Sequence, residues 1–246
     1  MIAHRGNSGP LPENTLRAIE SAVDLGVDMI EVDVRMTKDD VAVLLHDARV
    51  DDTTSGSGFV AELTLAELRT LDAGSWRGDE FADELIPTLD EVLALARGRV
   101  ALNLDVKVPE AARPTVAAVT RSAMTDQVVI SGCAADCVED ISEMTRDIAV
   151  LFNLDEMLEG AETDEIRTVA RSSVDIAARL GAVAINVPHS LVDAALVERA
   201  HSADIGVWTF TVDDSSRFVE VMEMGVTSLT TNWPERMLPL VPARTR

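Results

Sequence analysis

The chain has 246 residues, which fits one α/β barrel of about 250 residues and leaves little for a second domain. Asp and Glu total 43 against 21 Lys and Arg, a balance that argues against a nucleic-acid surface and against docking on anionic lipid, since both need basic residues. The N-terminus lacks a signal-peptide pattern, and no stretch reaches about 18 consecutive apolar residues. We therefore expect a cytoplasmic protein with no stable membrane insertion.

Strand-like and helix-like segments alternate along most of the chain, which is typical of a parallel α/β fold. Eight strands are predicted, at 1–4, 29–34, 100–106, 127–131, 148–152, 182–187, 206–212 and 227–231. Amphipathic helices are predicted between most of them, at 14–25, 89–96, 114–124, 163–179, 192–201 and 216–224. Eight strands with crossover helices predict a TIM (β/α)8 barrel.

One further strand, at 41–46, breaks this alternation. It follows the strand 29–34 after a short polar turn, whereas a parallel crossover needs about a dozen residues or more. We therefore expect an antiparallel hairpin that returns His46 to the C-terminal mouth of the barrel, where barrel enzymes carry out their chemistry. The segment 47–87 is then a long insertion with a short helix at 65–71, and we interpret it as a cap over the mouth of a single domain spanning 1–246.

Two histidines are predicted to meet at this mouth, because His4 ends the first strand and His46 ends the hairpin. Histidine can move protons near neutral pH, and two of them could act as base and acid on one phosphorus centre. Arg5 adds a planar fork suited to phosphate oxygens. Next to the first helix, Asn14 or Thr15 could serve as the N-cap. Taken alone, His4 and Arg5 could also be a strand-end histidine beside a surface arginine.

Glu31 and Asp33 lie two residues apart on a predicted strand, so both carboxylates face the same side. Like charges inside a barrel repel each other and are costly to desolvate, a conflict that a Ca²⁺ or Mg²⁺ ion would resolve. Asp105 could be a third ligand, and Lys107 on the same strand face could hold a phosphate oxygen. The alternatives are ion pairs, of Arg35 with the first two carboxylates and of Lys107 with Asp105.

Trp208 lies on a late strand, and the segment 230–234 follows the last one. The indole could form an apolar wall for the glycerol or alcohol part of a ligand. Packing in the core is the other interpretation of a tryptophan on a strand.

Together these motifs resemble the glycerophosphodiester phosphodiesterase family. The matching pieces occur in the family's order, at 2–6, 12–15, 30–34, 37–39, 45–47, 53–54, 71–76, 86–89, 102–107, 207–209 and 230–234. The resemblance implies a TIM barrel with a small insertion after the second-strand hairpin. It also implies metal-dependent hydrolysis of a small-molecule glycerophosphodiester to sn-glycerol 3-phosphate and an alcohol. The roles that it implies are acid–base catalysis for His4 and His46, Ca²⁺ or Mg²⁺ binding for Glu31, Asp33 and Asp105, and substrate binding for Arg5, Lys107 and Trp208.

Three positions depart from the family's pattern. Asp105 stands where the family usually has Glu, Asp52 where it often has Arg, and Asn232 where the late signature usually has Asp. The alternatives kept open are a phosphodiesterase acting on lysophospholipids, sugar phosphodiesters or cyclic phosphates, a metal-dependent barrel isomerase or aldolase, and a non-catalytic barrel that binds a ligand. The sequence leaves the alcohol, the metal and the oligomeric state open.

Overall fold

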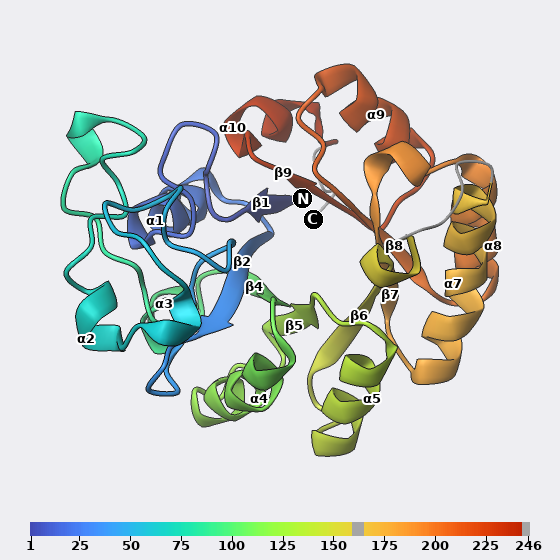
Figure 1. The fold of residues 1–246 in the computed structure, drawn as a ribbon. Helices are drawn as coiled ribbons and strands as arrows, with labels where there is room; N and C mark the ends of the chain where they lie inside the picture. Colours follow the sequence, from blue (N-terminus) through green and yellow to red (C-terminus); the bar gives the residue numbers. More distant parts are fainter. Residues whose placement is uncertain (159–164, 243–246) are drawn as a thin grey trace.

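Eight parallel strands close into a barrel, with helices around its outer side (Figure 1). The structure is a computed structural model and describes residues 1–158 and 165–242. The first strand of the barrel pairs with both the second and the last, so the sheet has no open edge within the barrel. The barrel strands are β1 (Ile2–His4), β2 (Met29–Met36), β4 (Ala101–Val106), β5 (Val128–Ser131), β6 (Ala149–Asn153), β7 (Ala184–Pro188), β8 (Gly206–Phe210) and β9 (Ser228–Thr231).

Helices connect these strands, and the sequence predicts most of them within a few residues. They are α1 (Leu16–Leu25), α3 (Leu89–Ala96), α4 (Ala112–Arg121), α5 (Ala135–Met144), α6 (Asp155–Leu158), α7 (Ile166–Leu180), α8 (Ala194–Ser202), α9 (Ser215–Glu223) and α10 (Pro234–Met237). The first two residues of the helix predicted at 163–179 lie outside the described residues. Short 3-10 turns add η3 (Pro109–Ala111), η4 (His189–Leu191) and η5 (Leu238–Leu240). Both the barrel and its small insertion are thus confirmed.

Alternate residues of β2 serve the core and the barrel interior. Ile30, Val32 and Val34 are fully buried in the main hydrophobic core, where burying each such side chain stabilises the fold by about 1.5–3 kcal/mol. Glu31 and Asp33 alternate with them and therefore point to the other side of the strand. The packing of the apolar residues thus fixes the direction of the two carboxylates.

The expected hairpin is present. β3 (Ala42–Leu44) pairs antiparallel with β2, with Leu44 opposite Val34. The short turn before it includes Asp40 at φ 59°, in the left-handed region. Because the chain reverses at this turn, the residues after β3 return toward the barrel, and His46 is among them.

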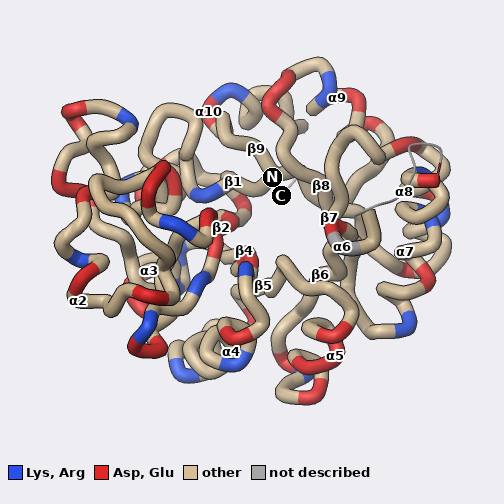
Figure 2. Tube along the Cα trace, viewed as in Figure 1, with Lys and Arg blue, Asp and Glu red and all other residues tan. Residues whose placement is uncertain are grey.

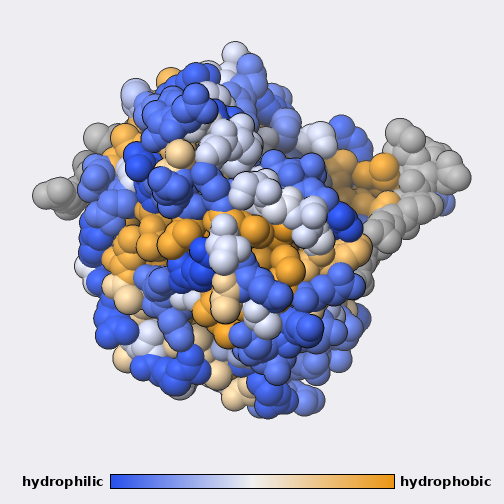
Figure 3. Space-filling view, turned by 60° about the vertical axis from the view of Figure 1, so that its left-hand side comes forward, coloured by the Kyte–Doolittle hydropathy of each residue, from blue (hydrophilic) through white to orange (hydrophobic). Residues whose placement is uncertain are grey.

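The insertion at 47–87 shares a second hydrophobic cluster with the hairpin strand before it, and we call this cluster the insertion core. The insertion contains η1 (Val60–Glu62), α2 (Leu65–Leu68) and η2 (Asp79–Phe81), and it lies beside α1 and α3 (Figure 1). Three of the large exposed hydrophobic residues belong to this segment, and Figure 3 shows hydrophobic residues gathered on the face that this side presents. The insertion core consists of Val43, Leu45, Val50, Val60, Leu68, Ala73 and Ile86.

Among the described residues, no helix combines the length and the hydrophobicity that crossing a membrane requires.

Candidate active site

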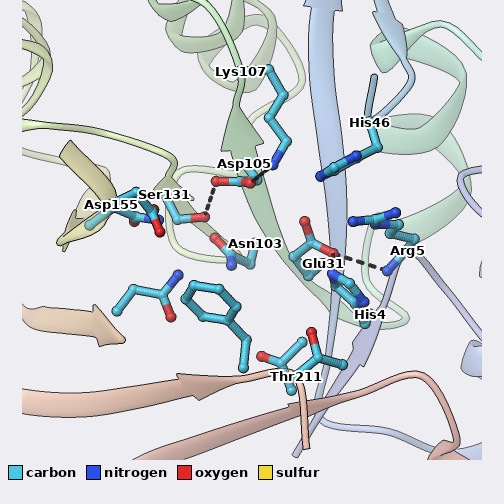
Figure 4. A pocket seen from close by; sticks show the side chains of 14 residues that line it. His4, Arg5, Glu31, His46, Asn103, Asp105, Lys107, Ser131, Asp155 and Thr211 are labelled. Carbon is cyan, nitrogen blue, oxygen red and sulfur yellow. Dashed lines mark hydrogen bonds and ion pairs between the residues drawn. The ribbon is translucent and has the colours of Figure 1, made fainter. Parts of the chain in front are cut away.

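A cavity of about 380 Å³ opens where the barrel strands end, and it holds most of the residues singled out in the sequence (Figure 4). Figure 2 shows acidic and basic residues close together around β1, β2 and β4. Among the described residues, none from 47–87 lines the cavity, so the cap remains an expectation. The lining residues are His4, Arg5, Glu31, His46, Asn103, Asp105, Lys107, Ser131, Asn153, Asp155, Asn186, Phe210, Thr211 and Thr230.

Strand register brings three carboxylates together. Asp33 on β2 lies opposite Asp105 on β4, and Glu31 lies opposite both His4 on β1 and Asn103 on β4. As a result, one carboxylate oxygen from each of Glu31, Asp33 and Asp105 lies within 4.8 Å of the others. Strand pairing thus brings Asp105, from a distant part of the sequence, beside Glu31 and Asp33, which the two-residue strand period already places on one side of β2.

Two cations lie against these carboxylates. Lys107 Nζ is 2.9 Å from Asp33 Oδ1 and also pairs with Asp105. Arg5 Nη1 pairs with Glu13 Oε1 at 2.8 Å, and its Nε lies 3.2 Å from Asp33 Oδ2. The two cations therefore partly neutralise the acidic cluster.

Arg35 holds the end of the hairpin instead of forming the ion pair with the β2 carboxylates that the sequence offered as an alternative. Its Nε and Nη2 donate to the backbone carbonyl of His46, at 2.9 and 2.7 Å, rather than pairing with Glu31 or Asp33. The side chain thus fastens the end of the hairpin to β2. Sequence reasoning missed this role, because a carbonyl acceptor leaves no trace in the sequence.

The electrostatics separate the two buried carboxyls of β2. Burial raises the pKa of Glu31 well above its ordinary value, and the neighbouring Asp33 and Asp105 raise it further. Burial would also raise the pKa of Asp33, but Lys107 and Arg5 outweigh that effect and lower it to about 2. Burial would lower the pKa of Lys107, whereas Asp105 and Asp33 raise it above its ordinary value. Without a metal ion, the site therefore favours ionised Asp33 beside charged Lys107 and the protonated, uncharged form of Glu31.

These residues fit a hard divalent cation. Three carboxylates converge, and the buried Oδ1 atoms of Asp33 and Asn103 have no hydrogen-bond partner. Lys107 Nζ lies near Asp33 Oδ1 as an ion pair, but the contact is not aligned as a hydrogen bond. The ammonium therefore offsets the charge of Asp33 but leaves a lone pair of Oδ1 unused. A divalent cation between these oxygens would accept their unused lone pairs and offset the repulsion between them.

The loops behind the cluster support it. Thr15 caps α1, while Asn14, at φ 57°, donates from Nδ2 to Asp33 Oδ2 at 2.7 Å and accepts from the Asp33 amide at 3.1 Å. On the other side, Ser131 Oγ donates to Asp105 Oδ1 at 3.0 Å. Asn14 is therefore a support for the carboxylates rather than the cap of the helix.

Gly132, just after β5, approaches the cluster closely. Its φ is +77°, and a Cβ there would lie 2.4 Å from the Val106 carbonyl oxygen and 2.5 Å from Asp105 Oδ1. Its amide donates to Asn153 Oδ1 at 3.0 Å. Only glycine fits this approach of the backbone to Asp105.

The two histidines have different surroundings. Burial, followed by Arg5, lowers the pKa of His4 to about 4, so its ring is neutral at pH 7. His46 is more exposed, and its Nδ1 lies 2.9 Å from Asp47 Oδ1. Both rings line the cavity, so one uncharged and one carboxylate-paired histidine are available there.

The wall across the cavity is mostly uncharged. Figure 4 shows Asp155 and Ser131 on the side away from His4 and His46, and Asn153 donates to Asp155 at 3.3 Å. Phe210, at the end of β8, lines the cavity, whereas Trp208 lies two residues earlier and is not among the lining residues. The contact of Trp208 with substrate therefore stays a prediction, and Phe210 is an aromatic lining residue that sequence reasoning missed.

Comparison with known proteins identifies the family. A model of the "Glycerophosphoryl diester phosphodiesterase family" matches residues 4–236. A glycerophosphodiester phosphodiesterase of Caldanaerobacter subterraneus subsp. tengcongensis is 32% identical over 248 residues, covering 98% of this chain and 97% of that protein.

Solved structures of similar proteins share the fold. The glycerophosphodiester phosphodiesterase from Agrobacterium tumefaciens has a TM-score of 0.82 at 26% identity, covering 97% of this chain and 98% of its own. An Oleispira antarctica phosphodiesterase, solved in complex with the product sn-glycerol-3-phosphate, has a TM-score of 0.81 at 27% identity, covering 97% and 94%. With its barrel, its acidic cluster and a match over nearly its whole length, the chain belongs to the glycerophosphoryl diester phosphodiesterase family and is an enzyme of that class.

Proposed function

We propose that the enzyme hydrolyses glycerophosphodiesters to sn-glycerol 3-phosphate and an alcohol, with a divalent cation held by Glu31, Asp33 and Asp105. The convergence of these three carboxylates beside Lys107 carries the proposal, because such a cluster suits a cation and then a phosphate. The complex of the Oleispira antarctica relative with sn-glycerol-3-phosphate supports the choice of product. When bound, the cation would offset the charge of the carboxylates and of a phosphate oxygen, and so act as a Lewis acid.

The residues of the chain divide the remaining work. The guanidinium of Arg5 and the ammonium of Lys107 neutralise and orient the phosphate, because both line the cavity beside the carboxylates. His4, which is neutral at pH 7, takes the proton of the nucleophile, either water or the glycerol 2-hydroxyl. His46, paired with Asp47, gives a proton to the alcohol oxygen as its bond to phosphorus breaks. Where the 2-hydroxyl is the nucleophile, a cyclic phosphate forms, and water then opens it to sn-glycerol 3-phosphate, with His46 taking the proton of water and His4 returning its proton to the 2-oxygen.

The test is the release of sn-glycerol 3-phosphate from glycerophosphocholine in Ca²⁺, Mg²⁺ or EDTA. We expect activity with a divalent cation, and a loss of about 10²-fold or more in His4→Ala and in His46→Ala. His201→Ala, on the exposed side of α8, is the matched control and should keep full activity. Full activity of His46→Ala on this unactivated substrate would overturn the histidine roles, and activity in EDTA would overturn the metal role.

The same assay separates the alternative substrates. A lysophospholipid, a sugar phosphodiester and a cyclic phosphate are compared with glycerophosphocholine at equal concentration. Faster release from one of these than from every glycerophosphodiester tested would replace the proposed substrate class and leave the proposed chemistry in place.

A further inference from the structure

A chain of hydrogen bonds leads from the surface to the ring of His4. His4 Nδ1 lies 2.6 Å from Asn232 Oδ1, and the Nδ2 of the same amide donates to Asp213 Oδ2 at 2.6 Å. Asn232 follows β9 and Asp213 follows β8, so the contacts join three neighbouring strand ends of the barrel. The catalytic histidine is thus held by residues that do not line the cavity.

The orientation of the amide follows from chemistry. Asp213 Oδ1 accepts from the Asn232 backbone amide at 2.8 Å and from Thr231 Oγ1 at 3.0 Å, so both of its oxygens act as acceptors. An ionised carboxylate can only accept, and the amide must therefore turn its NH2 toward Asp213 and its oxygen toward His4. The Ser8 hydroxyl lies 3.0 Å from that oxygen, but its one hydrogen also has the His4 carbonyl oxygen as an acceptor at 2.7 Å, so the orientation rests on Asp213.

The amide oxygen in turn decides which ring nitrogen of His4 carries the hydrogen. An amide oxygen only accepts, so a neutral His4 must carry its hydrogen on Nδ1. Nε2 is then left with its lone pair. This nitrogen lies 3.8 Å from Glu31 Oε2, on the side of the ring that faces the acidic cluster.

We propose that Asn232 and Asp213 are positioning residues that hold His4 in the Nδ1–H tautomer, so that Nε2 is the atom that accepts the proton of the nucleophile. The inference rests on the proposed function, in which His4 acts as the base. Neither residue touches the substrate or the reacting atoms. Their effect reaches the reaction only through the ring of His4.

The variant Asp213→Asn is designed to reverse the tautomer. The Asn232 backbone amide still requires an oxygen at the Oδ1 position, so the new side chain must present its NH2 to the Asn232 side chain. Asn232 then turns its own oxygen toward residue 213 and its NH2 toward His4. Nδ1 must now accept, the hydrogen moves to Nε2, and the lone pair facing the cavity is lost.

The double variant Asn232→Asp with Asp213→Asn exchanges the two side chains and should restore the tautomer. The NH2 at position 213 donates to the new carboxylate at position 232, whose other oxygen accepts from His4 Nδ1. Rescue of Asp213→Asn by the second change would show that the two positions are coupled. Asp214→Asn is the matched control, since it removes the neighbouring charge but can still cap α9.

Turnover separates positioning from a merely structural role. We expect Asp213→Asn to lower kcat by about 10²-fold with little change in KM, because wrong protonation removes the base. The kcat of the double variant should recover to within about 10-fold of the wild-type value. The kcat of Asp214→Asn should equal that of the wild type. Full activity of Asp213→Asn overturns the proposal, and so does a double variant as slow as the single one. A wild type without phosphodiesterase activity would instead refute the proposed function.

The tautomer itself is measured without turnover. ¹⁵N–¹H correlation spectra of protein labelled at its histidines distinguish Nδ1–H from Nε2–H rings, and loss of one signal in His4→Gln assigns His4. We expect Nδ1–H in the wild type and Nε2–H in Asp213→Asn. An Nε2–H ring in the wild type would overturn the proposal even if Asp213→Asn does not fold.

Discussion

Lys107 is the cation on which the metal-free acidic cluster depends most, and Lys107→Met removes its charge with little change of volume. Lys107 is the largest attractive influence on Asp33, whose pKa falls from 3.8 to about 2. At 1.36 kcal/mol per unit, that depression corresponds to about 2 kcal/mol of stability at pH 7. The low end of the cost of breaking a buried pair, about 3 kcal/mol, is of the same order. We therefore expect the variant to melt about 4–8 °C below the wild type.

Thermal unfolding in EDTA at pH 7 measures this difference. Lys38→Met is the matched control, because Lys38 is exposed and makes no ion pair with the acidic cluster. Added Ca²⁺ should raise the melting temperature of Lys107→Met more than that of the wild type, since the carboxylates have lost their resident cation. Activity of the variant should nevertheless fall, because the phosphate loses a cationic partner.

The pH dependence gives this prediction a sign. A depressed pKa contributes stability that is present above the unfolded value of 3.8 and is lost as the pH falls through about 2. The gap between wild type and Lys107→Met should therefore be full near neutral pH and shrink below about pH 4. Equal melting temperatures in EDTA at pH 7, or a gap that widens in acid, would refute the reasoning.

Three further predictions follow from the same site. In EDTA at pH 8, Glu31→Gln should melt at a higher temperature than the wild type, because burial raises the pKa of Glu31 and its ionisation costs stability as the pH rises above 4.5. Added Ca²⁺ should not change the melting temperature of this variant. A lower melting temperature than that of the wild type at pH 8 contradicts the prediction. Arg35→Met frees the His46 carbonyl and should lower kcat about 10-fold or more with a small change in melting temperature, and an unchanged kcat contradicts it. Gly132→Ala should lose more than about 2 kcal/mol in urea unfolding, whereas Gly98→Ala, at φ +70° in open space, should lose about 1 kcal/mol; equal losses would mean that the contacts of Gly132 with Asp105 are relaxed.

Local patterns in the sequence account for much of the site. The two-residue period of a strand places Glu31 and Asp33 on one side, and the short turn after β2 predicts the hairpin that carries His46. Both inferences concern residues close in the chain, whose geometry follows from the backbone alone.

The remainder depends on contacts between distant residues. The register that sets Asp33 beside Asp105 follows from closure of the barrel, and no pattern within either strand encodes it. Likewise, Asn232 stands out in the sequence only as a departure from the family's pattern, because its contact with His4 joins residues 228 apart. Asn14 looks like a helix cap in the sequence because the same residue types serve caps and buried supports.

The two histidines rest on separate packing units. His4 ends β1, which packs in the main core, while His46 follows β3, whose Val43 belongs with Leu45 to the insertion core. Small clusters open at a lower free energy than the whole fold, and local opening is cooperative within each unit. A local opening of the insertion core would therefore loosen the support of His46, which Leu44 and Arg35 still tie to the barrel, and leave the three carboxylates assembled. If the proposed roles hold, we expect turnover to be lost before the three carboxylates separate as conditions become less favourable for the fold.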